Sequence, residues 1–362
     1  MKKICWITPD CFLDTDFYII PFLCKHFNIE WYVLYKDSIP NKKELEKLES
    51  ISNLKIIPYR QEFRMRSIKT LFSDYTLFKT INRRGYDIVY AGMAGFPYFH
   101  LLSAIMLKRS KIVIAAHNVN TPKGAVNYLG AKIYANYVLN TFKNFHTFSL
   151  SQHNLLLSLH PLKNVLMAPF MLKDYGIPTV QKHSLTTFLS FGNIRDYKRI
   201  DVLINASQNA YERTNKKFRV IIAGSCSEWE KYQKLIKYPD LFDLRICRVE
   251  NKDIPNLFGE SHYFVTPYQD IAQSGSAIVA INYDCPIISS DLEAFREYVQ
   301  DNQTGFLFKP ADVEDLTGII TNILLTENAD YERLRNNVIK VKEKEFSSNA
   351  ITMLYKNFFD SL

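Results

Sequence analysis

The segment 187–206 constrains the fold of this chain more than any other. Its apolar residues 187–191 are typical of a buried strand that stops at Gly192, and a loop with the cations Arg195 and Lys198 follows. Apolar residues then recur at helical spacing and predict a helix: Ile200, Leu203, Ile204 and Ala206. Backbone N–H groups and the helix dipole favour a phosphate, and Arg or Lys adds charge-assisted hydrogen bonds, so this pattern predicts an anion site. An ordinary turn with solvated basic residues is the alternative.

A second block, residues 262–308, continues the alternation of strands and helices. Residues 262–268 predict a strand that runs into a loop, and Gln273, Ser274 and Gly275 open a predicted helix. Glycine lets the backbone approach a ligand closely, so this helix start can bring several amides to a diphosphate.

In this order, the two blocks resemble the signature of family 4 glycosyltransferases over residues 187–310, with F-G-x-I-R-x-Y-K at 191–198 and S-G at 274–275. The resemblance implies an α/β chain with the GT-B fold, in which two Rossmann-like, doubly wound parallel-sheet domains face a cleft. It also implies an enzyme that moves a hexose from a nucleotide diphosphate sugar to a hydroxyl of a glycan acceptor, with retention of the anomeric configuration.

The same resemblance implies how the leaving diphosphate is stabilised. In enzymes of this fold, protein cations and helix amides surround the diphosphate, so that no metal and no other cofactor is required. The residues expected to bind it here are Arg195, Lys198, Gln273, Ser274 and Gly275.

Two positions depart from the family pattern. The glycine that usually follows the lysine is Arg199, and the second of two family glutamates is replaced by Val279. The first glutamate falls near Ile271, so we expect the adjacent Asp270 to be the catalytic carboxylate beside the donor sugar. Gln273 offers an amide that both donates and accepts hydrogen bonds, and a subset of the family has this Q-S-G variant. The missing glutamate supports an alternative function, a non-catalytic nucleotide-sugar or glycan-binding protein.

Strands alternate with helices in the first half of the chain as well, which implies a parallel doubly wound sheet. A length of 362 residues suits two domains. We expect an N-terminal acceptor domain at 1–172 and a C-terminal nucleotide-sugar domain at 183–345. The first helix is expected at 17–27. The family resemblance implies that the last segment, 346–362, docks back onto the first domain.

The residues expected on the acceptor side follow two strands of the first domain. His117 and Asn118 come directly after the apolar run 111–116, at the carboxyl end of a parallel strand, where α/β folds bind ligands. The family resemblance implies a catalytic His117 that contacts the donor sugar or the reacting groups, with a capping or core-edge histidine as the alternative. We expect Asn118 to bind a sugar hydroxyl or to cap the turn. Asp14 and Asp16 follow the first strand and suit a general base or a solvated helix cap. Their D-x-D spacing occurs at the wrong place for a metal site, so no metal is expected.

Positive charge is concentrated in the first half of the chain. Residues 1–170 contain 22 Lys and Arg against 11 Asp and Glu, and no acidic residue lies between Asp87 and Asp174. Such a balance favours an anionic partner. The segment 59–72 interleaves cations with apolar residues, which suits an anionic membrane surface or a solvated helix packed by its apolar side. We expect a cytoplasmic protein, peripheral at the inner membrane face, with a polyprenyl-diphosphate-linked acceptor in lipopolysaccharide or capsule synthesis.

Several other classes of protein are disfavoured by what the sequence lacks. Its six cysteines include no C-x-x-C pair, which indicates reduced thiols rather than disulfides or zinc. The N-terminal apolar run is too short for a signal peptide, and no apolar stretch is long enough to span a bilayer. The first strand is not followed by G-x-G-x-x-G, which argues against a nicotinamide-dependent oxidoreductase. No nucleic-acid-binding motif accompanies the basic charge.

Overall fold

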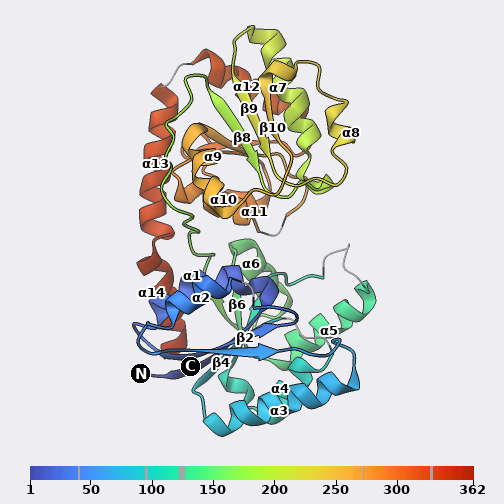
Figure 1. Cartoon of the computed structure of the whole chain (residues 1–362), viewed down its shortest axis with the longest axis vertical. Coiled ribbons are helices and arrows are strands. Elements are labelled where there is room, and N and C mark those ends of the chain that lie inside the picture. The colour runs from blue at the N-terminus through green and yellow to red at the C-terminus, as the bar shows by residue number, and fades with distance from the viewer. Residues whose placement is uncertain (40, 94–96, 122–126, 272, 327–328) are drawn as a thin grey trace. The chain divides into compact units, whose positions relative to one another are not determined.

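The computed structural model describes residues 1–39, 41–93, 97–121, 127–271, 273–326 and 329–362 (Figure 1). The chain forms two compact units. The N-terminal unit consists of Met1–Met171 together with Ser348–Leu362, and the C-terminal unit is Leu172–Ser347. Each unit has one parallel sheet with helices on both faces, so the prediction of two parallel-sheet α/β domains is confirmed.

The N-terminal sheet has seven parallel strands in the order β3-β2-β1-β4-β5-β6-β7. Its strands are β1 (Lys3–Pro9), β2 (Asn28–Tyr35), β3 (Leu54–Arg60), β4 (Ile88–Gly92), β5 (Ile112–Ala116), β6 (Asn144–Thr147) and β7 (Asn164–Met167). Its helices are α1 (Leu13–Leu23), α2 (Lys42–Leu48), α3 (Ile68–Arg84), α4 (Phe99–Met106), α5 (Tyr128–Thr141), α6 (Leu150–Leu159) and α14 (Ser348–Asp360). Helices α1, α2 and α14 bury their apolar sides on one face, and α3, α4 and α5 on the other.

The C-terminal sheet has six parallel strands in the order β10-β9-β8-β11-β12-β13. Its strands are β8 (Thr187–Phe191), β9 (Arg219–Ala223), β10 (Phe242–Arg245), β11 (Tyr263–Thr266), β12 (Ile287–Ser290) and β13 (Gly305–Phe308). Its helices are α7 (Ile200–Thr214), α8 (Glu230–Gln233), α9 (Ile254–Glu260), α10 (Gly275–Asn282), α11 (Glu293–Arg296), α12 (Val313–Leu325) and α13 (Ala329–Glu345). Helices α7 and α12 pack together on one face of this sheet. Short 3-10 turns precede several elements, among them η1 (Asp10–Phe12) and η3 (Asp196–Lys198).

Strand order places a ligand-binding edge in each unit. The order reverses between β1 and β4 in the first sheet and between β8 and β11 in the second. In open parallel sheets, ligands bind outside the carboxyl ends of the strands at such a switch point. Ligands are therefore expected beyond the carboxyl ends of β1 and β4 in the first sheet and of β8 and β11 in the second, and β5 is the strand next to β4.

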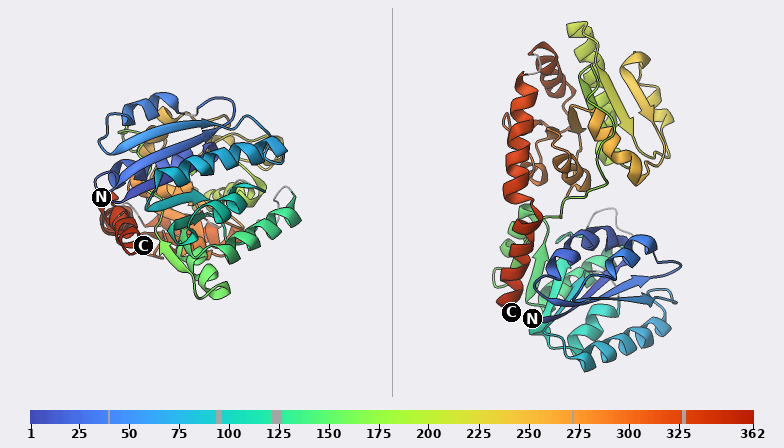
Figure 2. Two further views of the ribbon diagram at one scale, coloured as in Figure 1. Left: turned by 90° about the horizontal axis from the view of Figure 1, so that it is seen from below. Right: turned by 60° about the vertical axis from the view of Figure 1, so that its left-hand side comes forward.

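The C-terminal helix α14 completes the core of the N-terminal unit. Its buried Tyr355 and Phe359 pack with Trp6 and Tyr90, whose rings stack with centroids 3.8 Å apart. The two chain ends lie side by side in both views (Figures 1 and 2), and Lys2 Nζ donates a 2.8 Å hydrogen bond to the Phe359 carbonyl. No helix in the described parts of the chain is both long and apolar enough to cross a membrane.

One expected helix and one helix that was left open as an alternative differ from the structure. The first helix begins four residues before the expected start, at Leu13, and ends at Leu23, because residues 24–27 form a turn before β2. The segment 59–72 is not one amphipathic helix. Its first residues belong to β3, which ends at Arg60, and α3 begins only at Ile68, where the Ser67 side chain accepts the Lys69 N–H as an N-cap.

Candidate functional site

Two glycines shape the loop between β8 and α7 in the C-terminal unit. Gly192 has φ +108, and a Cβ added there would lie 3.0 Å from the Lys198 Nζ atom. Gly224, at the end of β9, has φ +151, and a Cβ there would lie only 2.2 Å from the Gly192 carbonyl oxygen. Both positions favour glycine because their φ values are positive, and at Gly224 a Cβ would also collide with the Gly192 backbone. The glycines thus allow the Lys198 side chain to lie beside Gly192, just after the end of β8.

Lys198 is a buried cation that has no counter-ion among the residues that the structure describes. Only 8% of the residue is exposed, and its ammonium lies 5.1 Å from the centroid of the Tyr268 ring. Burial lowers the pKa of the ammonium, and among the described residues no carboxylate forms an ion pair with it. A buried charge is unfavourable unless it is paired, and one aromatic face offsets only part of this loss. The site is therefore complementary to an anion.

Tyr268 joins the two predicted binding segments. Its ring lies under Lys198 and contacts the Tyr197 ring edge-on at 5.7 Å, while its hydroxyl is 3.3 Å from the Ser276 Oγ atom in α10. Tyr268 lies two residues after Thr266, the last residue of β11, which is the strand next to β8. The structure thus brings the cationic loop and the start of α10 to the same edge of the sheet.

The start of α10 has the features of an anion-binding helix terminus. Ser274 is the N-cap, and its Oγ accepts the Ala277 N–H at 3.2 Å. A Cβ added to Gly275 would meet no described heavy atom within 4 Å, so the backbone there faces open space. The first N–H groups of a helix have no partner inside it and carry the positive end of the helix dipole. An anion beside Gly275 would meet these amides.

The remaining residues predicted in this unit are placed as follows. Arg195 is exposed at the start of η3, and Asp270 is exposed in the loop between β11 and α10. Gln273 is half-buried just before the N-cap of α10. Val279 is buried within α10, so this position supplies no carboxylate.

In the N-terminal unit, His117 is part of an aromatic stack at the carboxyl end of β5. Its ring is parallel to those of Phe12 and Phe148, with centroids 4.0 and 4.3 Å away. Burial lowers the pKa of His117 to about 4, although the negative charge of Asp14 acts in the opposite direction. His117 is therefore neutral near pH 7 and suits a hydrogen bond to a hydroxyl. Its neighbour Asn118 is half-buried.

Asp14 and Asp16 have different environments. Asp14 is exposed in the first turn of α1. Asp16 is buried and accepts a hydrogen bond from the Thr8 hydroxyl, which in turn accepts the Trp31 indole N–H at 2.8 Å. Burial raises the pKa of Asp16 to about 7. The reading of Asp16 as a solvated helix cap is wrong, because α1 already begins at Leu13 and turns this residue toward the core.

The sequence did not predict two sets of contacts at these sites: those of Tyr268 and those of the aromatic partners of His117. Tyr268 was included only in an expected strand, and the partners of His117, Phe12 and Phe148, carried no signal of their own. The only available signal for Tyr268 was its place just after a strand in the second block. Its contact with Lys198 depends on β8 and β11 being neighbours in the sheet.

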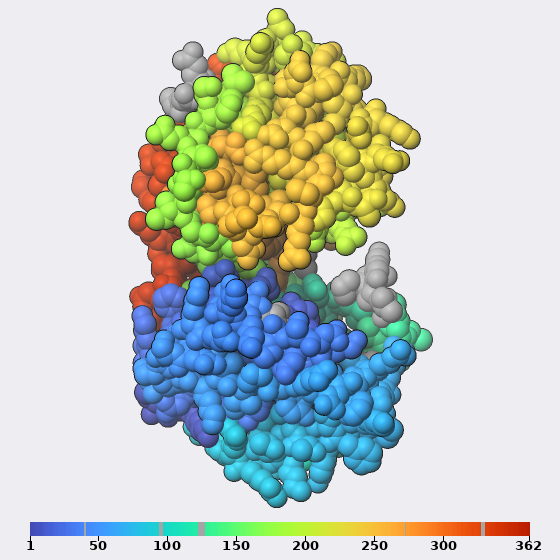
Figure 3. Space-filling view, in the orientation of Figure 1, coloured from blue at the N-terminus to red at the C-terminus, as the bar shows by residue number. Residues whose placement is uncertain are grey.

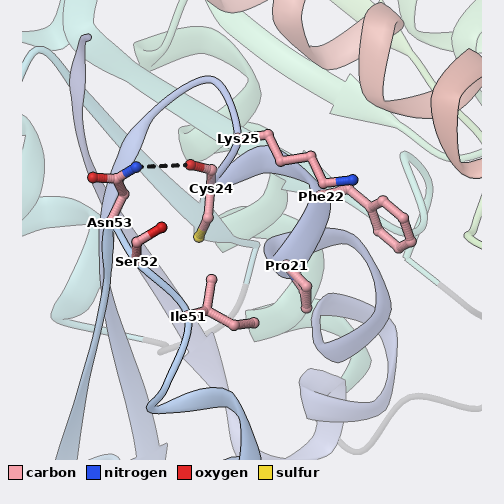
Figure 4. A pocket seen from close by; sticks show the side chains of 7 residues that line it. All are labelled: Pro21, Phe22, Cys24, Lys25, Ile51, Ser52 and Asn53. Carbon is pink, nitrogen blue, oxygen red and sulfur yellow. Dashed lines mark hydrogen bonds between the residues drawn. The ribbon is translucent and has the colours of Figure 1, made fainter.

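An open hollow of about 570 Å³ lies elsewhere in the N-terminal unit (Figure 4). It is lined by Pro21, Phe22, Cys24, Lys25, Ile51, Ser52 and Asn53. These residues lie at the end of α1 and just before β3, at the amino edge of the sheet. None of the predicted site residues lines the hollow, so it is separate from the candidate site.

Comparisons with known proteins identify the domain and the fold. Residues 179–341 match the family of glycosyl transferases group 1. No curated protein matches the sequence. Sucrose-phosphate synthase from Thermosynechococcus elongatus has a similar structure, with a TM-score of 0.75 and 14% identity over 100% of both chains. A glycosyltransferase from Rickettsia africae ESF-5 gives a TM-score of 0.74 and 14% identity over 99% of this chain and 98% of that one.

A third similar structure is Anabaena Alr3699/HepE in complex with UDP-glucose, with a TM-score of 0.72 and 14% identity over 100% of both chains. At these identities the likeness shows the fold, and the predicted GT-B fold is confirmed. The residues that match glycosyl transferases group 1 lie within the C-terminal unit, and the prediction of a glycosyltransferase is confirmed. Membership of family 4 stays a prediction.

Proposed function

We propose that this protein transfers a hexose from a nucleotide diphosphate sugar to a hydroxyl of a glycan acceptor, as the resemblance to family 4 implies. The observation that carries the proposal is the buried ammonium of Lys198, which has no carboxylate partner among the described residues and shares Tyr268 with the start of α10. A diphosphate would supply the missing negative charge. The structure of Anabaena HepE with UDP-glucose supports a ligand of this class for the fold.

In this proposal, the residues of the C-terminal unit stabilise the leaving group. Lys198, the exposed Arg195 and the amides at Ser274–Gly275 oppose the negative charge that develops on the diphosphate as the glycosidic bond breaks. Gln273 contributes an amide to the same group. These contacts would make a metal or another cofactor unnecessary.

The remaining predicted residues are assigned to the sugar and the acceptor. Asp270 would contact the donor sugar, and the neutral His117 would hydrogen-bond to a hydroxyl. Asn118 and Asp14 lie at the same carboxyl edge of the N-terminal sheet and are assigned to the acceptor. Asp16 would act through its buried bond to Thr8 rather than as an exposed base. We propose that transfer retains the anomeric configuration.

The proposal is tested with nucleotides and nucleotide sugars. UDP, GDP and CMP are screened by thermal shift, and we expect one of them to stabilise the wild-type protein. Radiolabelled sugars of that nucleotide should then be transferred or slowly hydrolysed, and NMR of the product reports its anomeric configuration. If no nucleotide binds and no sugar is released, the proposal is wrong. Tight binding without any turnover would instead favour the non-catalytic binding protein, which the buried Val279 supports.

We also propose that the acceptor is lipid-linked and that the N-terminal unit binds an anionic membrane surface from the cytoplasmic side. The outer side of α3 supports this. Ile68, Phe72 and Tyr75 are 60, 66 and 46% exposed, and Lys79 and Arg83 continue the same stripe at helical spacing. The only acidic residue of this helix, Asp74, is buried. Helix α3, in light blue, lies on the surface of the N-terminal unit (Figure 3).

Removing two positive charges from α3 is expected to weaken vesicle binding. Each Lys or Arg near an anionic surface contributes about 1 kcal/mol, so Lys79→Ala/Arg83→Ala should lower the affinity about 30-fold. Co-sedimentation with phosphatidylglycerol-containing vesicles measures this effect, and pure phosphatidylcholine should bind neither protein. The matched control is Lys234→Ala/Lys237→Ala, two exposed lysines of the C-terminal unit. Equal losses in both double variants would contradict a binding surface on α3.

A further inference from the structure

Arg199 has a backbone conformation that an arginine rarely adopts. Its φ is 47 and its ψ is 48, at the junction between η3 and α7. The left-handed region is unfavourable by about 1–2 kcal/mol for a residue with a side chain. Glycine would occupy this position without strain, and the family signature has glycine there. The arginine side chain must therefore offer an interaction that glycine cannot provide.

That interaction is a fork of hydrogen bonds that reaches two segments. Arg199 Nε donates to Asp201 Oδ1 at 3.0 Å and Nη2 donates to Oδ2 at 2.8 Å, which forms a bidentate ion pair. The third nitrogen, Nη1, donates to Gln269 Oε1 at 3.4 Å. The guanidinium is half-buried, so its geometry is restricted more than that of a solvated arginine.

Gln269 lies in the loop that leads to α10 and has a second bond to the cationic loop. Its backbone N–H donates to the Tyr197 carbonyl at 2.7 Å. Gln269 is thus held to residues on both sides of Lys198, by its backbone at Tyr197 and by its side chain at Arg199. The loop 267–275, whose residue 272 lies outside the described residues, contains this attachment and leads into α10 at Gly275.

We propose that Arg199 is a positioning residue that holds the Lys198 loop against the loop 267–275. Because Lys198 directly precedes Arg199, fixing the guanidinium also fixes the backbone from which the buried ammonium extends. The cation and the amides of α10 are then arranged for a diphosphate before it binds. This inference rests on the proposed function and names a residue outside the predicted ligand set.

The test compares Arg199→Gly with Arg199→Lys. Glycine relieves the backbone strain and removes the fork, so thermal stability should change little while the affinity for the nucleotide found by the screen falls about 10-fold, since the site is no longer pre-organised. Lysine keeps the charge without the planar fork and should show a similar loss. The matched control is Arg213→Ala, which breaks the exposed Arg213–Glu314 pair at the far end of α7.

A second measurement does not depend on nucleotide. Hydrogen exchange of the backbone amides of residues 268–271 and 273–275 should be faster in ligand-free Arg199→Gly than in the wild type or in Arg213→Ala, because the Gln269 side chain loses its hydrogen bond from Arg199. If Arg199→Gly proves unstable, Asp201→Asn disrupts the same fork without changing the backbone and should give the same two effects.

The outcomes separate the two proposals. Unchanged exchange in this loop, or wild-type affinity in both Arg199 variants, overturns the role of Arg199 alone. If the wild type binds no nucleotide while the loop still exchanges faster in Arg199→Gly, the proposed function fails and the coupling of the two loops is retained.

Discussion

Replacing Lys198 by alanine should weaken nucleotide diphosphate binding about 100-fold and reduce sugar transfer at least as much. Truncating one partner of a buried, hydrogen-bonded charge pair typically loses 2–5 kcal/mol of binding, and a diphosphate would be the partner of this ammonium. Lys198 is only 8% exposed, so solvent does not screen the interaction. Isothermal titration with the nucleotide found by the screen measures the affinity.

Although Lys198→Ala should lower the nucleotide affinity, it should not lower the thermal stability of the ligand-free protein. A buried cation without a counter-ion opposes folding, so its removal should raise the thermal unfolding temperature or leave it unchanged. The matched control is Lys231→Ala, an exposed lysine of the same unit that pairs with Asp196 and Glu228. Its nucleotide affinity should equal that of the wild type. A Lys198→Ala protein that binds as tightly as the control would show that the ammonium does not contact the ligand.

Replacing Phe359 by alanine should destabilise the N-terminal unit by about 3–5 kcal/mol. The Phe359 side chain is completely buried, and its ring contacts Phe27 at 5.7 Å and Tyr355 at 5.8 Å between centroids. Removing it leaves a cavity among aromatic rings that cannot easily close. By calorimetry or far-UV circular dichroism, the transition of this unit should shift down by about 10 °C.

Leu354 provides the control for this prediction on the same helix. It is 40% exposed, so Leu354→Ala removes little buried area and should change the stability by less than about 0.5 kcal/mol. Comparable shifts for the two variants would mean that α14 does not close the core of the N-terminal unit. A loss seen only for Phe359→Ala would show that the buried side of α14 stabilises the N-terminal unit.

Much of the fold was predictable because it depends on local patterns. Apolar runs of four to seven residues between helical repeats specify buried parallel strands, and Gly192, with φ +108, marks a turn that few other residues allow. Element boundaries were less predictable. The first helix starts at Leu13 rather than at residue 17, and α3 starts at Ile68, because a cap and a turn decide these ends and apolar periodicity does not.

The sequence alone determined the alternation of strands and helices, the kinds of side chain in the loops that follow the strands, and the separation of charge between the two halves of the chain. Only the tertiary structure decided which of those residues are buried and what they touch. Strand order placed Tyr268 beneath Lys198, and burial at the stack with Phe12 and Phe148 lowered the pKa of His117. These contacts join residues far apart in the chain, and desolvation depends on all the neighbours in space, which no local pattern contains.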